Sequence, residues 1–178
     1  MKATGIVRRI DDLGRIVIPK EIRRTLKIRE GNSLEIYTDS QGSVIFRKYS
    51  PIGEMDEIAE TYAQVISKMT GRPALICDNE RVIAVSGAPK KEYLDKKISQ
   101  SMENIIYDRE VFIYDKNSKT VKAFEGSEKK ASIVIPIIVS SETVGAIFSV
   151  CDENEEGTEI QKKLMQASAL LLEKQLGF

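Results

Sequence analysis

The chain has 178 residues, enough for one ordinary domain or two small ones, and its 27 Lys/Arg balance 27 Asp/Glu. It has no histidine and two cysteines, Cys77 and Cys151, which excludes most zinc sites and Cys-His catalysis and predicts two buried, reduced thiols. No apolar run reaches the roughly 18 residues of a membrane helix, and the N-terminus lacks the apolar core of a signal peptide, so we expect a cytoplasmic protein.

Charge is distributed unevenly along the sequence. Residues 1–50 hold 11 Lys/Arg and 6 Asp/Glu, a balance of +5, whereas residues 51–178 hold 16 and 21, a balance of −5. Such asymmetry suggests a module for a polyanion joined to a second domain. We therefore expect a basic domain over 1–50, a linker over 51–55 and a second domain over 56–178.

The first fifty residues predict a ββαββ order of elements. Alternating apolar and basic residues predict strands over 2–11 and 15–18, followed by a short helix over 20–28 and two strands over 30–39 and 44–49. A single core of this size is marginal, so we expect an obligate homodimer. The apolar strand residues available to a shared core are Ile6, Ile10, Ile16, Ile18, Leu34, Ile36, Val44 and Phe46.

Five arginines are interleaved with these apolar positions: Arg8, Arg9, Arg15, Arg23 and Arg24. A planar guanidinium can bind a phosphate or the edge of a guanine through two hydrogen bonds, and folding could bring the five to one surface. They would then bind double-stranded DNA with an affinity that falls steeply with salt. The alternative is a set of solvated side chains paired with Asp11, Asp12 and Glu21, and the residue pattern alone leaves both open.

The segment TGIVRRIDDLGRIVIPKEIRRTLKI, residues 4–28, closely resembles the N-terminal DNA-binding domain of the AbrB family of transition-state regulators. The resemblance implies a swapped-hairpin β-barrel dimer, all-β in type. It also implies a transcriptional regulator, activator and repressor, of sporulation and transition-state genes, associated with the nucleoid. Because the segment lacks a helix-turn-helix, we expect the sheet, loops and short helix to contact loosely defined A/T-rich sites.

The resemblance also assigns residues to the DNA interface. It implies contacts from Arg8, Arg15, Arg23 and Arg24; we add Arg9 because of its proximity and Lys2 because of its charge.

The second domain is predicted to combine helices with about six strands. Helices are expected over 53–71, over 89–108 and from Thr158 onward, and strands over 74–78, 81–86, 111–115, 119–124, 131–139 and 144–152, with Pro136 marking an edge or a bulge. The segment SIVIPIIVSSETVGAIFSV resembles the GAF pattern, with Pro136, Gly145 and Ala146 in the matching places. The resemblance implies an α+β domain, an antiparallel sheet flanked by helices, with an unknown small-molecule ligand between them.

The last helix carries two apolar stripes, about 140° apart at 100° per residue. One holds Ile160, Leu164, Ala167 and Leu171, and the other holds Met165, Ala169, Leu172 and Leu176. One domain surface covers only one stripe, so we expect the second to form an oligomer interface that assembles dimers into a homotetramer. The alternative is a helix sandwiched inside one domain.

The sequence predicts a DNA-binding regulator and no enzyme, cofactor, metal site or catalytic residue, because it contains no nucleotide-binding or nucleophile motif. The GAF-like domain would sense a ligand or assemble the tetramer. Two rivals stay open: an AbrB-fold antitoxin, which would carry a short disordered tail, and a ligand receptor whose basic domain contacts RNA or protein.

Overall fold

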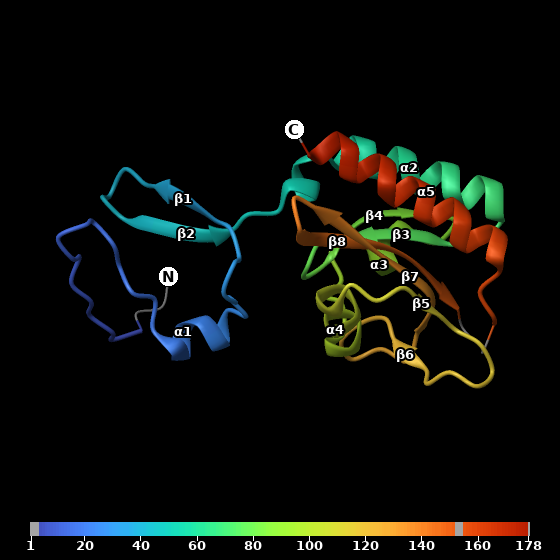
Figure 1. Ribbon diagram of the computed structural model, residues 1–178, viewed down its shortest axis with the longest axis horizontal. Coiled ribbons are helices and arrows are strands. Elements are labelled where there is room, and N and C mark those ends of the chain that lie inside the picture. Colours follow the sequence, from blue (N-terminus) through green and yellow to red (C-terminus); the bar gives the residue numbers. More distant parts are fainter. Residues whose placement is uncertain (1–3, 152–154, 178) are drawn as a thin grey trace. The chain divides into compact units, whose positions relative to one another are not determined.

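The computed structural model describes residues 4–151 and 155–177 (Figure 1). The chain divides into two compact units, residues 1–49 and 50–178, so the boundary falls one residue before the expected end of the first domain. Lys2 lies outside the described residues.

Residues 4–49, the described part of unit 1, contain one helix and one hairpin. Helix α1 spans Lys20–Thr25 and follows Pro19, whose missing N–H costs nothing at a helix start. Strands β1 (Leu34–Thr38) and β2 (Val44–Lys48) pair antiparallel, with Leu34 opposite Lys48. The predicted helix and the two later strands are therefore present in shortened form.

The strands predicted over 2–11 and 15–18 are not formed by the described residues of those ranges, 4–11 and 15–18. Residues 4–18 include a turn but no paired strand among those described. Alternating residues indicate a strand, but a strand also needs a paired neighbouring strand. Among the described residues this segment makes only local backbone hydrogen bonds around its turn, such as Asp11 N–H to Arg15 O (3.0 Å).

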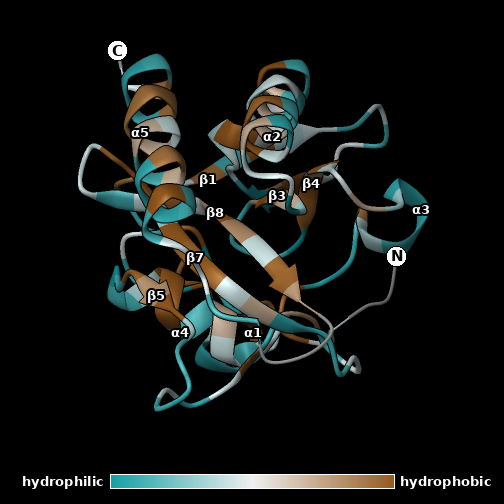
Figure 2. Cartoon of the chain, turned by 90° about the vertical axis from the view of Figure 1, so that its right-hand side faces the viewer, coloured by the Kyte–Doolittle hydropathy of each residue, from teal (hydrophilic) through white to brown (hydrophobic). Residues whose placement is uncertain are grey.

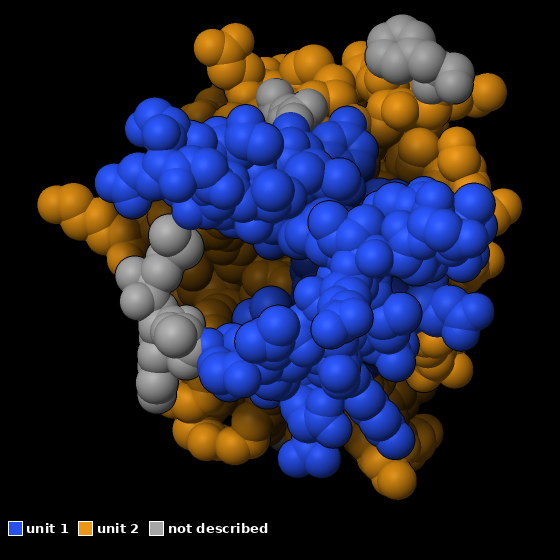
Figure 3. Space-filling view, turned by 90° about the vertical axis from the view of Figure 1, so that its left-hand side faces the viewer, with its two compact units in different colours: residues 1–49 blue, residues 50–178 orange. Residues whose placement is uncertain are grey.

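Unit 1 has no interior of its own. None of its described residues is buried, and Figure 3 shows an open, hollowed surface. Six of the eight apolar residues expected to contribute to a shared core are exposed in one chain, including Ile10 at 65%, Ile36 at 62% and Val44 at 57%, while Ile18 and Leu34 are half-buried. Single exposed apolar residues are normal on a protein surface, but so many in one small unit indicate a surface that binds another protein.

Unit 2 is built on a six-stranded antiparallel sheet in the order β4-β3-β8-β7-β5, with β6 also paired to β7. The strands are β3 (Ala74–Cys77), β4 (Val82–Ser86), β5 (Phe112–Ile113), β6 (Val121–Lys122), β7 (Lys130–Val139) and β8 (Glu142–Cys151). The helices are the 3-10 helix η1 (Pro51–Glu54), α2 (Asp56–Thr70), α3 (Lys90–Tyr93), α4 (Gln100–Asp108) and α5 (Glu159–Leu176).

Both faces of this sheet are covered, and strand alternation separates two cores. On β3, Ala74 and Ile76 face the core beneath α2 and α5, whereas Leu75 and Cys77 face the core that contains residues of α3 and α4. Figure 1 shows α2 and α5 lying side by side on one face, and Figure 2 shows apolar residues on both helices. Covering both faces explains why these strands read as continuous apolar runs.

The helix predicted over 89–108 is two short helices, so that prediction was wrong. The backbone between α3 and α4 pairs with neighbouring segments instead of continuing the helix. Val82 N–H donates to Lys96 O (3.0 Å), and Ile98 bridges to Phe124. Asp95, at φ +60°, makes the turn that allows this pairing.

Pro136 lies in the middle of β7, which is not an edge strand of the sheet. It pairs with Ala146 on β8, while β5 pairs with β7 only as far as Val134. The proline therefore removes no N–H needed on its β5 side, and a register irregularity follows between Ile137 and Ile138, one residue beyond the expected place.

The segment expected to be a linker, 51–55, is part of unit 2. It forms η1 and the N-cap residue of α2, Met55, and Ile52 is fully buried beneath α2 and α5. The expectation of a linker was wrong because Ile52 contributes an apolar side chain to the second core.

The expected oligomer interface on α5 is also corrected. Met165, Ala169 and Leu172 are buried in the core of their own unit, and Leu176 packs against it, so this stripe faces the sheet. The opposite stripe is the open one, with Ile160 at 79% and Leu171 at 54% exposure, which also contradicts a sandwiched helix. The predicted start is confirmed: Thr158 Oγ1 accepts from Gln161 N–H (3.2 Å).

Cys77 and Cys151 are buried, as predicted, and burial raises the pKa of the Cys77 thiol well above its usual range. Across residues 4–151 and 155–177, no helix is long and apolar enough to cross a membrane.

Candidate nucleic-acid interface

Arg15 is held by a turn that Asp11 organises. The Asp11 carboxylate accepts hydrogen bonds from Leu13 N–H (3.1 Å) and Arg15 N–H (2.7 Å), and its second oxygen accepts from Arg15 Nε (2.8 Å). Gly14 takes φ +76°, a conformation that favours glycine. The backbone N–H of Arg15 holds the pKa of Asp11 below its usual range. The turn thus positions Arg15 while leaving its side chain 69% exposed.

Arg23 and Arg24 occupy the last turn of α1. The helix has no buried residue, and both arginines are exposed. The backbone of this turn is fixed: Arg23 N–H donates to Pro19 O (2.9 Å), and Ile28 N–H donates to Arg23 O (2.7 Å). A short, hydrogen-bonded helix therefore presents two guanidinium groups from adjacent positions.

Arg8 and Arg9 lie on the irregular segment before the Asp11 turn, and both are exposed. The five expected arginines thus come from three consecutive parts of one unit: this irregular segment, the turn and α1. Their exposure is what phosphate or base contact requires. Of the expected counter-ions, Asp11 is paired with Arg15.

Two basic residues on β2 were missed by the sequence analysis. The guanidinium of Arg47 lies over the ring of Tyr37 at 4.9 Å, and Arg47 stands opposite Glu35 across the hairpin. Lys48 is half-buried and pairs with Leu34. Cross-strand pairing of this kind ties Arg47 to its own sheet. The sequence could have indicated this role for Arg47, because the predicted hairpin places it opposite the acidic residue Glu35.

The whole chain matches a known protein along its length. It is 44% identical over 178 residues, 99% of both chains, to stage V sporulation protein T of Bacillus subtilis (strain 168). Residues 54–177 match the family profile described as stage V sporulation protein T C-terminal, transcription factor. The chain belongs to the stage V sporulation protein T family. It is thus a member of a family of transcription regulators of sporulation, as the sequence predicted.

Part of the chain has further relatives. The chain is 36% identical over 105 residues to the transition state regulatory protein AbrB of Bacillus subtilis (strain 168), covering 59% of this chain and 97% of that one. The predicted AbrB resemblance is therefore confirmed. Residues 7–54 also match a profile described as antidote-toxin recognition MazE, bacterial antitoxin.

The second unit has the predicted GAF fold. The GAF domain from an Acinetobacter phosphoenolpyruvate-protein phosphotransferase superposes with a TM-score of 0.53 at 6% identity, over 68% of this chain and 81% of that one. At this identity the likeness concerns the fold alone.

Proposed function

We propose that this protein regulates transcription by binding double-stranded DNA through Arg8, Arg9, Arg15, Arg23 and Arg24 of unit 1, with Lys2 adding charge. The observation that carries the proposal is the set of exposed arginines, one fixed by the Asp11 turn and two by α1, on the basic part of the chain. Such groups supply both phosphate contacts and base contacts. The protein would act at the chromosome, in the cytoplasm, and no catalytic role is assigned to it.

The DNA-binding surface would belong to a homodimer. Residues 4–18 carry the alternation of strands but pair with no strand among the described residues, and most apolar residues of unit 1 are exposed. A second copy would supply both the missing partners and the missing cover, which is what a swapped-hairpin barrel does. The obligate dimer therefore explains two features of the single chain at once.

The second unit would assemble dimers into a tetramer through the exposed side of helices α2 and α5. Ile160 and Leu171 on α5 are exposed, and the neighbouring helix α2 adds Val65 at 49% and Met69 at 71% exposure. Acidic and polar residues lie between these positions, so the face is amphipathic and suits packing against helices of a second copy.

Substitutions at two neighbouring positions of α5 should separate assembly from stability. Leu171→Asp is expected to halve the assembly mass in native mass spectrometry while unit 2 stays folded. Leu172→Ala is expected to lower the free energy of unfolding by about 2–5 kcal/mol because Leu172 is fully buried. An unchanged mass for L171D would contradict the tetramer interface.

Assembly is favoured over ligand sensing as the role of unit 2. Side chains fill the space between the sheet and α3 and α4: the ring of Phe124 lies 5.5 Å from that of Tyr93 and 6.0 Å from that of Phe148, centroid to centroid. All three are buried. A small-molecule ligand on this face would have to displace part of an aromatic core.

The antitoxin alternative is weakened by the second unit. The antitoxin profile covers residues 7–54 alone, whereas an antitoxin of this fold was expected to carry a short disordered tail. Here the chain continues into a folded unit with two cores.

Titration of labelled nucleic acids tests the proposed function. The full chain should bind A/T-rich duplex DNA more tightly than RNA of the same sequence at physiological salt. Its log Kd should rise linearly with log salt concentration, with a slope of about 0.9 per phosphate contacted. Equal affinity for the RNA would favour the receptor alternative, and a slope near zero would rule out the arginine surface.

A further inference from the structure

Two turns in the described part of unit 1 share one backbone pattern, at residues 11–15 (DDLGR) and 39–43 (DSQGS). In each turn the N–H of the first residue donates to the carbonyl of the fifth, at 3.0 Å for Asp11 and 3.1 Å for Asp39. In each, the fourth residue is a glycine at positive φ, +76° in the first turn and +81° in the second. The backbone of the two turns is therefore built in the same way.

The carboxylate at the first position stabilises both turns. One oxygen of Asp39 accepts from Gln41 N–H and Ser43 N–H (2.9 Å each), just as one oxygen of Asp11 accepts from two N–H groups of its own turn. The N–H of the fifth residue, Ser43 or Arg15, is the main cause that holds the pKa of each carboxyl below its usual range. Both acids are therefore anions at neutral pH, and the second turn forms without an arginine.

The fifth residue is where the two turns differ. In the first turn it is Arg15, and the second oxygen of Asp11 accepts from its Nε–H (2.8 Å). The donors on the terminal nitrogens, Nη1 and Nη2, make no further hydrogen bond within residues 4–151 and 155–177. These two nitrogens form the fork with which an arginine binds a pair of acceptors. Asp11 thus holds one edge of the guanidinium and leaves the fork exposed.

This arrangement distinguishes Arg15 from the other arginines of the proposed DNA-binding surface. Among the described residues, the other four make no ion pair with a carboxylate: Arg8, Arg9, Arg23 and Arg24. Exposed arginines without a neighbouring anion suit contacts to phosphate. Arg15 is the one whose charge is partly balanced before any DNA arrives.

We propose that Asp11 is a positioning residue that directs the fork of Arg15 to the edge of a guanine in the major groove and away from a phosphate. The inference rests on the proposed DNA binding and adds the base that one of its arginines contacts. Each chain would then specify one G·C base pair within an otherwise A/T-rich site.

The physical reason is the negative charge that Asp11 places beside the fork. A phosphate bound to the fork would lie close to a carboxylate of the same sign, with only the guanidinium between them. Guanine offers O6 and N7 as neutral acceptors at the spacing that the fork fits, so it meets no such repulsion. The bond to Asp11 also restricts the rotation of the Arg15 side chain, so binding orders less of it.

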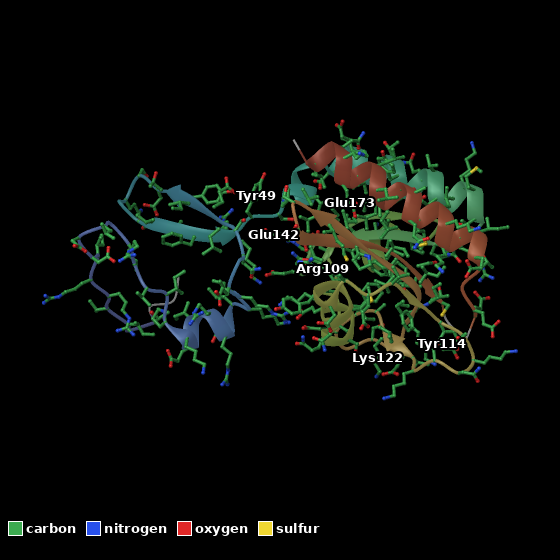
Figure 4. The ribbon with its side chains drawn as sticks, viewed as in Figure 1. Tyr49, Arg109, Tyr114, Lys122, Glu142 and Glu173 are labelled. Carbon is green, nitrogen blue, oxygen red and sulfur yellow. The ribbon has the colours of Figure 1, made fainter. Side chains whose placement is uncertain are left out.

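Substitution of the two acids tests the proposal, because the second turn is a matched control. Asp11→Asn retains the oxygen that accepts two backbone N–H groups and replaces the oxygen that holds Arg15 by an NH2 group. Asp39→Asn removes the same charge from the turn that ends in a serine. Its hairpin is closed at the other end by Tyr49, labelled in Figure 4, whose N–H donates to Ser33 O (3.0 Å). Both variants are therefore expected to fold.

The probe is a DNA duplex selected from a random pool by the full natural chain, with each guanine replaced in turn by 7-deazaguanine, which lacks the N7 acceptor. For the natural chain, one such replacement should raise Kd about tenfold. For D11N this effect should fall below about threefold, and the slope of log Kd against log salt concentration should rise by about 0.9 for each phosphate gained. For D39N both quantities should match the natural chain.

Arg15→Lys separates the fork from the charge. Lysine keeps the positive charge but has no fork, and it leaves the backbone bonds of the turn in place. The effect of 7-deazaguanine should therefore fall below about threefold, as for D11N. Circular dichroism checks that each variant is folded, and if D11N is not, R15K decides. An R15K protein that keeps the tenfold effect would show that another residue contacts the guanine, which would overturn the inference.

The remaining outcomes are equally decisive. A folded D11N protein that keeps the full effect would show that Asp11 only stabilises its turn. A D39N protein that loses the effect to the same extent would show that total charge decides, and a natural chain that tolerates every replacement contacts no guanine through N7. Each of these results overturns the inference while DNA binding stands. A natural chain that binds no duplex would instead refute the proposed function itself.

Discussion

Replacing Arg23 and Arg24 together by alanine should weaken binding to duplex DNA about 100-fold, or roughly 3 kcal/mol. Both side chains are exposed on the last turn of α1, and every dimer would lose four guanidinium groups from its DNA-facing surface. The melting temperature should hardly change, because α1 has no buried residue and alanine favours a helix. Fluorescence anisotropy at fixed salt measures the first effect, and circular dichroism the second.

The matched control removes two positive charges from the other unit. Lys116→Ala with Lys119→Ala changes net charge equally, in an exposed loop of unit 2. Its effect should stay within about threefold, because these lysines do not belong to the proposed DNA-binding surface and charges that contact no phosphate are largely screened at physiological salt. If the arginine pair and the lysine pair weaken binding equally, the affinity reflects total charge and the arginine surface is wrong.

Gly145→Ala should unfold unit 2 or destabilise it by more than about 3 kcal/mol. A Cβ at this position would lie 2.0 Å from the carbonyl oxygen of Cys77 and 3.1 Å from Cα of Asp78. These are backbone atoms at the end of β3, and β3 pairs with β8 at the adjacent residues, Cys77 with Ala146. The two central strands would have to separate to make room.

Gly126→Ala provides the comparison for Gly145→Ala. Gly126 has φ +66°, and a Cβ there would meet nothing within 4 Å. Its replacement should therefore cost only the left-handed backbone penalty of about 1–2 kcal/mol. Urea unfolding of both variants measures the difference. Equal losses would show that β3 moves away from residue 145 without cost.

The second unit was predictable to the level of its strands because its sheet is covered on both faces. A strand buried on both sides reads as a continuous apolar run, as in ASIVIPIIV, and this signal is strong. The break between α3 and α4 was missed because it depends on pairing with residues far away in sequence, such as Phe124. The spacing of apolar residues does not reveal that the backbone between α3 and α4 pairs with distant segments instead of forming helix hydrogen bonds.

The two stripes of α5 show a second limit. Spacing of apolar residues established that the helix has two apolar faces, and the structure has both. Which face meets the sheet depends on the packing of Met165, Ala169 and Leu172 against strand residues, and this is information about the partner surface. Ile52 was missed for the same reason: a single isoleucine in the segment SPIG has no periodicity, and its burial depends on the cavity it fills.

The lack of an interior in unit 1 has a consequence for how long the protein survives. In the proposed homodimer this unit would gain its stability from association, because none of its described residues is buried within one chain, and the folded fraction would depend on protomer concentration. A chain without its partner would expose residues 4–18, where the structure has a turn but no paired strand, and exposed irregular segments are preferred sites of proteolysis. Dilution would thus lead to degradation as well as dissociation. When synthesis decreases, the concentration of the regulator would fall faster than it would through dilution alone.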